Sequence, residues 1–389
     1  MKVSPRNIYP FFFVSAAIIP ASPIFSYYTD FSSPQLYMVF FGLTVCTVLI
    51  ARNSINSKYL LLSVFLVITL LIESVYWQDS EIAIWGKYLI SSILLVGLLS
   101  KEGCIKIVNN SYYGLSLMAI FGIIAQIYVL SGGDALLVIS NPDGRSAYLF
   151  PGTMTNWWLG SFIRPAGTFD EPGSFAFYLA IILAARVIIK KQGRSDIYIA
   201  TLALSTLSVA YFLFYLLYLF QSGLGYLAKF LLGVAILTLI IPGAYNYSSL
   251  LVERFEIVDG SFKGNNRNDL IHNSLNIVKN GNLLFGTMKE CMVKSEICVD
   301  AYGSYGANPL TLQAAGGIIF SLPYYALILF FLYKASIVKR LRYIVIGLLI
   351  VFFVKPYIYS LAYSLIMMLL IRLLMIKMEP HGKYNYSNS

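Results

Sequence analysis

Charged residues are scarce in this chain. Aspartate, glutamate, lysine and arginine make up 12% of its 389 residues, hydrophobic residues make up 58%, and the mean hydropathy is +0.73. Apolar stretches of about 20 residues, enough to cross a bilayer as a helix, recur along the chain. No soluble domain of ordinary size fits between them. The sequence therefore predicts an all-α, polytopic membrane protein in which residues 1–389 form one membrane domain.

Histidine is almost absent, which bears on metal binding. The chain has two histidines, and one of them, His381, lies in the C-terminal tail. No separated set of aspartates and glutamates has the spacing of metal ligands. We therefore expect no metal site and no cofactor.

Cysteine is also sparse, with four residues. Cys46 falls in an expected membrane span and Cys104 on the inner side. Cys291 and Cys298 lie seven residues apart in an expected outer loop, where an oxidising compartment would allow a disulfide. Spacing alone does not establish the geometry of a bridge, so the bridged and free states both stay open.

Segmentation by apolar length predicts about twelve membrane helices. The first stretch contains three prolines and leads straight into further spans, so we interpret it as a retained helix and not as a cleavable signal. The expected helices are Ile8–Tyr28, Gln35–Ala51, Tyr59–Trp77, Ile82–Ser100, Tyr112–Leu130, Ser174–Ile189, Ile197–Ser208, Ala210–Gln221, Phe230–Tyr245, Pro309–Tyr333, Tyr343–Val354 and Tyr357–Met375.

The orientation follows from the basic residues. Three short spans between Ile197 and Tyr245 return two long polar loops, 131–172 and 247–307, to one side. Most of the 28 lysines and arginines then lie on the other side, which also holds both termini. Because basic residues concentrate in cytoplasmic loops, the termini are expected in the cytoplasm and the two long loops outside. The net charge of +10 is then mainly an orientation signal, and we expect no nucleic-acid partner.

The first outer loop ends in a pattern that starts a helix. Asp170 and Glu171 precede Pro172, and carboxylates stabilise a helix N-terminus where proline is well tolerated. This interpretation leaves Arg164 unexplained, since a helix N-terminus repels a cation. Arg164 either pairs with one of these carboxylates or faces an anionic ligand, and both alternatives remain open.

The second outer loop contains an expected amphipathic helix, Asn266–Asn280. Its apolar residues fall on one arc with Arg267 at the middle, which directs Arg267 toward whatever cavity the helix covers. Snorkelling of Arg267 past this face is the alternative. His272 projects from the polar side and is expected to be solvated or capping, with catalysis as the alternative role. The arc consists of Leu270, Ile271, Leu275, Ile277 and Val278.

These motifs resemble a known family. The run Arg164–Ala176 is similar to the arginine, glycine, phenylalanine, glutamate, proline pattern before a helix in bacterial Wzy-type O-antigen and capsule polymerases. In the second loop, Arg267 is followed by Asn282–Gly286 and then by Gly306–Leu310, which opens a span containing Gly316 and Gly317. The likeness covers nearly the whole chain, and its specificity comes from the order of these motifs and the topology.

The resemblance implies a metal-independent membrane glycosyltransferase of GT-C-like architecture in the bacterial cytoplasmic membrane. Its donor and acceptor would be undecaprenyl-diphosphate-linked oligosaccharides, and the growing glycan would move from its lipid carrier to the non-reducing end of a new repeat. Such chemistry needs a proton acceptor and cations for the departing diphosphate. A chain-length regulator is a further partner that the resemblance allows.

We assign the expected roles residue by residue. The proton acceptor is Glu171, with Asp170 and His272 as alternatives. Arginine suits the diphosphate because its planar fork binds phosphate through two donors. The diphosphate residues are Arg164 and Arg267, with Arg254 as a weaker candidate and Arg145 for a sugar or the acceptor phosphate. Trp157, Trp158 and Tyr148 either stack on sugars or belong to an interfacial aromatic belt.

Two other functions compete with polymerase. O-antigen ligases usually carry a histidine before the asparagine where this chain has Ala307, which favours polymerase over ligase. A flippase or exporter of lipid-linked glycan would place charges near mid-membrane, where this chain has mainly Glu73, Lys87 and Arg372. We find no convincing internal repeat, and most of the relevant charge lies in the outer loops.

Overall fold

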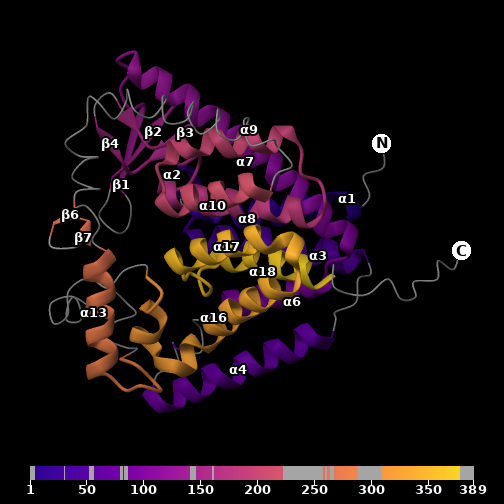
Figure 1. Ribbon diagram of the computed structural model, residues 1–389. Coiled ribbons are helices and arrows are strands. Elements are labelled where there is room, and N and C mark those ends of the chain that lie inside the picture. Colours follow the sequence, from indigo (N-terminus) through magenta and orange to yellow (C-terminus); the bar gives the residue numbers. More distant parts are fainter. Residues whose placement is uncertain are drawn as a thin grey trace, which may run out of the picture.

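Long apolar helices dominate the structure (Figure 1), a computed structural model. Among the described residues, four helices are long and apolar enough to cross a membrane, and a bent helix pair near the N-terminus makes a candidate fifth. The four are α3 (Ser33–Ile50), α4 (Ser57–Trp77), α7 (Lys101–Leu130) and α16 (Thr311–Ile337). The structure describes residues 5–29, 31–51, 57–78, 82, 86–140, 146–159, 162–221, 257–258, 261–262, 267–287 and 308–376.

The first expected span is bent. It consists of α1 (Pro5–Ile18), the 3-10 turn η1 (Ile19–Ala21) and α2 (Pro23–Thr29), and the two arms differ in direction by 89°. Pro20 and Pro23 flank the bend, and proline lacks the N–H that a continuing helix needs. The expected helix over Ile8–Tyr28 is therefore not continuous, although the bent pair remains a candidate span.

Shorter helices fill the middle of the molecule, and α8 lies at their centre. Almost every residue of α8 is buried, as expected for a helix that is apolar on all sides. It contacts α7, α10, α17 and α18. The shorter elements are α6 (Lys87–Leu98), α8 (Pro172–Ile188), α9 (Arg194–Leu202), η2 (Ala203–Thr206), α10 (Val209–Gln221), η3 (Lys339–Leu341), α17 (Arg342–Val354) and α18 (Leu361–Ile376).

The chain reverses between η2 and α10, as the sequence predicts near Ser208. Leu207 adopts a left-handed conformation with φ of 49°, which ends the helical run. The carbonyl oxygens of Thr206 and Leu207 accept hydrogen bonds from Arg164, so this turn lies against the first loop. The turn and the first loop are therefore at the same end of the molecule, as the predicted turn near Ser208 requires. The third of these spans, 230–245, lies outside the described residues.

Helix α7 is longer than the sequence analysis predicts. It begins at Lys101 and not at Tyr112, because the Ser100 side chain accepts a hydrogen bond from the Gly103 N–H at 3.1 Å and caps the helix. Its first three turns are polar and were missed because they lack a long apolar run. The extension carries Lys101 and Lys106, which the sequence analysis expects on the inner side.

Small sheets interrupt the helical architecture in both long loops, which the expectation of an all-α chain did not include. In the first loop β1, β2 and β3 form an antiparallel sheet, and β4 pairs with β5. In the second loop β6 pairs with β7. The strands are β1 (Leu137–Ser140), β2 (Ser146–Phe150), β3 (Thr153–Thr155), β4 (Trp158–Leu159), β5 (Phe162–Ile163), β6 (Ile257–Val258) and β7 (Ser261–Phe262).

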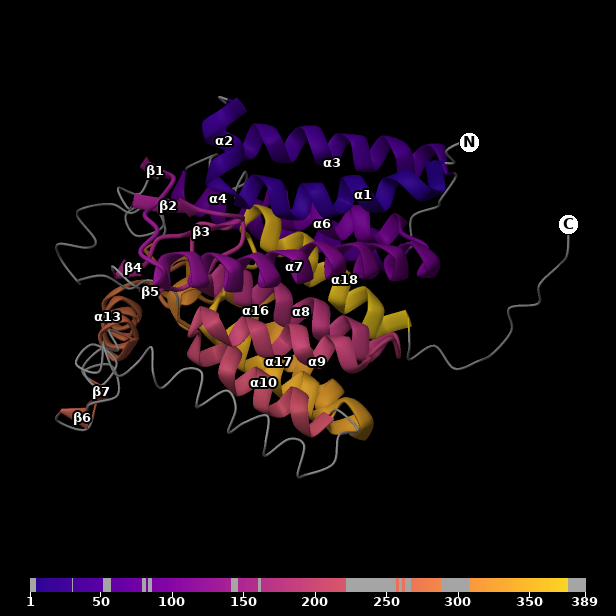
Figure 2. The same cartoon turned by 90° about the horizontal axis from the view of Figure 1, so that it is seen from above.

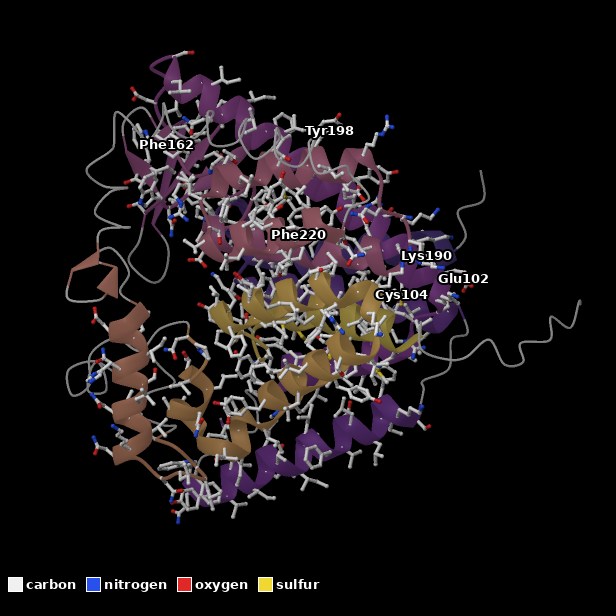
Figure 3. The ribbon with its side chains drawn as sticks, viewed as in Figure 1. Glu102, Cys104, Phe162, Lys190, Tyr198 and Phe220 are labelled. Carbon is white, nitrogen blue, oxygen red and sulfur yellow. The ribbon has the colours of Figure 1, made fainter. Side chains whose placement is uncertain are left out.

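The two loops lie at one end of the molecule. Figures 1 and 2 both place the strands of the first loop and helix α13 (Arg267–Asn280) at this end, which we call the loop end. The start of α1 and the end of α18 lie at the opposite end (Figure 2), which we call the terminal end. Figure 3 shows Phe162 at the loop end and Glu102 and Lys190 toward the terminal end. The described parts of the two loops thus lie at the end opposite the start of α1 and the end of α18.

Candidate active site

Glu171 stands at the start of α8 but does not cap it with its side chain. Its backbone is extended (φ −131°, ψ 147°), Pro172 takes the first helical position, and the Glu171 carbonyl oxygen accepts the Ser174 N–H at 3.1 Å. The side chain of Glu171 makes no capping hydrogen bond. A carboxylate at this position would ordinarily bind the free N–H groups of the first turn, so another partner holds it away.

That partner is Lys355, which lies in the short turn between α17 and α18. Its ammonium forms an ion pair with Oε1 of Glu171 and lies 5.2 Å from the centre of the Tyr357 ring. The Lys355 side chain is 10% exposed and the Glu171 side chain 27% exposed. A Cβ atom at Gly173 would lie 3.4 Å from the Lys355 Cε, a normal packing distance, so the lysine stem lies beside the first turn of α8. The pair is partly dehydrated but open to ligands on the glutamate side.

Two hydroxyl groups extend this site toward α18. The Ser174 hydroxyl donates to Oε1 of Glu171 at 3.2 Å, and the Tyr363 hydroxyl donates to Ser174 at 2.5 Å. The Tyr363 ring packs against Phe177 and Tyr178 in the core. These bonds fix the carboxylate from the α8 side, so that Glu171 is positioned both by the first turn of its own helix and by the distant segment that holds Lys355 and Tyr363.

Arg164 is bound to the backbone of the neighbouring turn. Its Nε donates to the Thr206 carbonyl oxygen at 2.9 Å and its Nη2 to the Leu207 carbonyl oxygen at 3.4 Å. The guanidinium lies 5.6 Å from the centre of the Trp157 ring. At least two of its donors therefore hold the turn before α10. Asp170, the other acidic residue of this motif, is half-buried in the turn that precedes Glu171.

The loop that carries Arg164 is tied down by its backbone. Met154 and Gly167 are joined by a hydrogen bond of 2.6 Å, and the Ala166 N–H donates to the Met154 carbonyl oxygen at 2.8 Å. Gln126 of α7 accepts the Ile163 N–H at 3.1 Å. Gly167 has a φ of 63°, which favours glycine and lets the chain turn toward α8. The motif from Arg164 to Glu171 is therefore held against α7 and presented at a fixed place.

The aromatic residues of the first loop pack on one another. Trp158 makes edge contacts with Tyr148 and Phe150, with ring centres 5.3 and 5.5 Å apart. Trp157 makes an edge contact with Phe162 and lies next to the Arg164 guanidinium. Phe150, Tyr148 and Trp158 belong to the small core of the loop. Whether any of them also binds sugar stays a prediction.

Helix α13 forms within one residue of its expected start. Ser274 and Ile277 are fully buried, while Leu275 is 40% exposed. The expected apolar arc was wrong at Leu275, because the face that meets α16 is set by a polar contact. Asn308, just before α16, donates through its side-chain nitrogen to the Ser274 hydroxyl at 2.9 Å and to the Leu270 carbonyl oxygen at 3.3 Å.

The candidate residues on α13 are placed differently. Arg267 is the first residue of the helix at the loop end, and its side chain lies outside the described part. His272 is exposed, and its Nδ1 lies 3.2 Å from the Asn276 side-chain nitrogen one turn along the same helix. This is the arrangement expected of a solvated residue. Arg145, Arg254, Cys291 and Cys298 lie outside the described residues.

Helix α16 is broken at Gly316 and Gly317, where the segment 282–287 inserts. The Ile318 and Ile319 N–H groups donate to the carbonyl oxygens of Leu283 and Leu284 at 3.1 and 3.2 Å. Gly317 has a φ of 63°, and a Cβ there would lie 2.3 Å from the Leu284 carbonyl oxygen. Two motifs that are separate in the sequence thus form one packed junction, which only glycine permits.

The charges expected inside spans have different surroundings. Glu73 on α4 is 1% exposed, and neither of its oxygens has a hydrogen-bond partner in the described part of the chain. Arg372 donates to the Tyr59 hydroxyl at 3.3 Å, and Lys87 lies over the Tyr88 ring at the start of α6. These three groups are on separate elements, and no cluster of three or more potential metal ligands occurs among the described residues.

The residues that sequence reasoning missed are Lys355, Ser174 and Tyr363. Lys355 carries a detectable signal, because it is a lysine before a proline in a tight turn on the side that has few basic residues. Ser174 and Tyr363 carry none, since a serine in a first helical turn and a tyrosine in a span are common. The chain has no match among family models, curated proteins or solved structures.

Proposed function

We propose that this protein is a membrane glycosyltransferase that polymerises oligosaccharide repeat units carried on undecaprenyl diphosphate. The observation that supports it best is Glu171, a partly exposed carboxylate held by Lys355 and Ser174 at the end where both long loops lie. The twelve-helix, GT-C-like architecture and a location in the bacterial cytoplasmic membrane, with the loop end outside, are parts of this proposal.

Glu171 would act as the general base. A hydroxyl of the non-reducing-end sugar of the acceptor attacks the anomeric carbon of the donor glycan and gives its proton to the Glu171 carboxylate. The bond from the anomeric carbon to the diphosphate oxygen breaks, and its electron pair leaves with undecaprenyl diphosphate. Cations near the diphosphate stabilise the charge that develops there.

The arginines have unequal roles in this proposal. Arg267 begins the helix that lies at the loop end, and it would contact the diphosphate, with Arg254 and Arg145 assisting. Arg164 would act mainly by fixing the turn before α10 and the loop that leads to Glu171, given its bonds to Thr206 and Leu207. The Arg164 guanidinium would still stabilise a negatively charged group placed beside it, through charge-assisted hydrogen bonds.

The test is reconstitution with defined substrate. Purified protein and lipid-linked repeat units should give a ladder of polymers, and Glu171→Gln should reduce the rate about 100- to 10,000-fold, as loss of a general base does. The folded fraction of this variant should match that of the wild type by size-exclusion chromatography. Undiminished ladders from Glu171→Gln would remove Glu171 as the base. Transfer only to lipid A core would indicate a ligase, and transport of unchanged substrate across a bilayer a flippase.

A further inference from the structure

We propose that Lys355 is a substrate-binding residue that exchanges its resting partner, Glu171, for the diphosphate of the lipid-linked donor. This inference rests on the proposed function and adds a residue that neither outer loop contains. It also explains how a glutamate that is paired in the resting protein can act as a base.

The burial of Lys355 requires an anion. Residue Lys355 is 8% exposed, and removing an ammonium from water costs several kcal/mol unless a negative charge compensates it. In the resting protein the Glu171 carboxylate supplies this charge through one oxygen, Oε1. A ligand that displaces the carboxylate must therefore bring at least one negative charge of its own.

The contact is of a kind that can be exchanged. The ammonium of lysine is a point charge on a flexible stem with three donors. It can therefore turn to a new acceptor without breaking a bidentate contact of the kind that arginine makes. The Tyr357 ring lies 5.2 Å from the ammonium, and the lysine stem lies beside Gly173. The ring supports the charge while the anion changes, because the face of an aromatic ring attracts cations.

A diphosphate fits both the charge of Lys355 and its position at the start of α8. It carries more negative charge than a carboxylate, so it competes well for a partly buried ammonium. The pair lies at the start of α8, immediately after the loop that carries Arg164. The substrate of the proposed reaction brings such a group to this end of the molecule.

The exchange would prepare both groups for the reaction. Once Lys355 binds the diphosphate, Glu171 loses the cation that stabilised its ionised form and holds a proton more readily. The Ser174 hydroxyl still donates to it. The acceptor hydroxyl then loses its proton to Glu171 while the electron pair of the breaking bond goes to the diphosphate beside Lys355. When undecaprenyl diphosphate leaves and Glu171 releases its proton, the resting pair forms again.

The experiment measures binding of undecaprenyl diphosphate, without turnover, to protein in nanodiscs. Lys355→Met should weaken binding about tenfold or more, corresponding to about 1.4 kcal/mol per factor of ten. Glu171→Gln should tighten binding about tenfold, because it removes the anion that competes for Lys355. Lys339→Met, at an exposed lysine in η3, is the matched control and should bind as the wild type does.

Two outcomes would overturn the inference: wild-type affinity in Lys355→Met, or weaker binding in Glu171→Gln. Should Lys355→Met not fold, Glu171→Gln alone still decides by the sign of its effect. The double variant Glu171→Lys with Lys355→Glu gives an independent readout. A purely structural pair would recover both stability and turnover, whereas we expect recovered stability with no turnover.

The result can be separated from the fate of the proposed function. If the wild type forms polymer but the binding pattern is absent, only this inference fails. If the binding pattern is present but no polymer forms, the diphosphate site stands and the polymerase proposal fails.

Discussion

Two ion pairs at the two ends of α8 differ in how far their carboxylates are buried. Near its C-terminal end, Arg186 pairs with Asp196, with Nε at 3.0 Å from both carboxylate oxygens. Its Nη1 donates to Asn109 and its Nη2 to the Lys191 carbonyl oxygen, while the guanidinium lies 3.9 Å from the centre of the Tyr112 ring. All three nitrogens are engaged and the Asp196 side chain is completely buried. We interpret this pair as a structural ion pair that stabilises the fold.

At the N-terminal end of α8, the pair of Glu171 and Lys355 is less closed. One carboxylate oxygen receives the ammonium, and the glutamate side chain is 27% exposed. The comparison teaches that charge pairing alone does not reveal a functional group. A pair whose carboxylate is completely buried stabilises the fold, whereas a pair whose carboxylate is partly exposed can exchange partners.

The largest effect on stability is expected for the buried pair of Arg186 and Asp196. Arg186→Met leaves Asp196 buried without its cation, and breaking a buried pair in this way costs about 3–5 kcal/mol. We expect little folded protein in detergent and a strongly lowered unfolding temperature. Arg340→Met, at an exposed arginine in η3, is the control and should behave as the wild type. A wild-type unfolding temperature in Arg186→Met would show that the pair does not stabilise the fold.

An intermediate effect is expected at Arg164. It tests whether an arginine at the loop end stabilises the fold, as Arg186 does. Arg164→Lys keeps the charge but cannot reproduce the two bonds to Thr206 and Leu207. We expect a loss of about 1–2 kcal/mol in the free energy of unfolding, since two backbone acceptors lose a charged donor. Thermal unfolding and turnover should be measured together. Reduced turnover with unchanged stability would instead favour direct contact with substrate.

The smallest effect is expected at Glu73, a buried carboxyl whose oxygens have no hydrogen-bond partner among the described residues. Glu73→Gln removes an ionisable group from the apolar interior while it keeps the shape. We expect the free energy of unfolding to stay within about 1 kcal/mol of the wild type or to rise. Unfolding in urea provides the measurement. Destabilisation as large as that of Arg186→Met would mean that Glu73 has a cationic partner in the rest of the chain.

Several elements could be predicted from the sequence because their signal is local. The helices α3, α4, α10 and α17 begin and end within two residues of the apolar runs that indicated them. The amphipathic period gave α13, and the acidic pair followed by Pro172 gave the start of α8. In each case burial of the apolar side chains or a helix cap depends on neighbours in the chain.

Other features could not be predicted because they depend on contacts between distant segments. The strands of the first loop are short, and they form where the loop folds back on α7. The break in α16 needs both Gly317 and the segment 282–287, and glycine alone does not reveal which backbone will approach it. The partner of Glu171 lies 184 positions away in the chain, at Lys355.

The sequence by itself determined that the chain is mostly helical and apolar, where its polar loops lie and which charged residues those loops contain. These properties follow from hydropathy and helix periodicity, which act over one or a few turns. Only the tertiary structure decided how the charges are paired. Arg164 holds the carbonyl oxygens of the adjacent turn before α10, and Lys355 holds Glu171. Pairing depends on distances of a few ångströms between segments that are brought together only by the packing of α7, α8, α17 and α18.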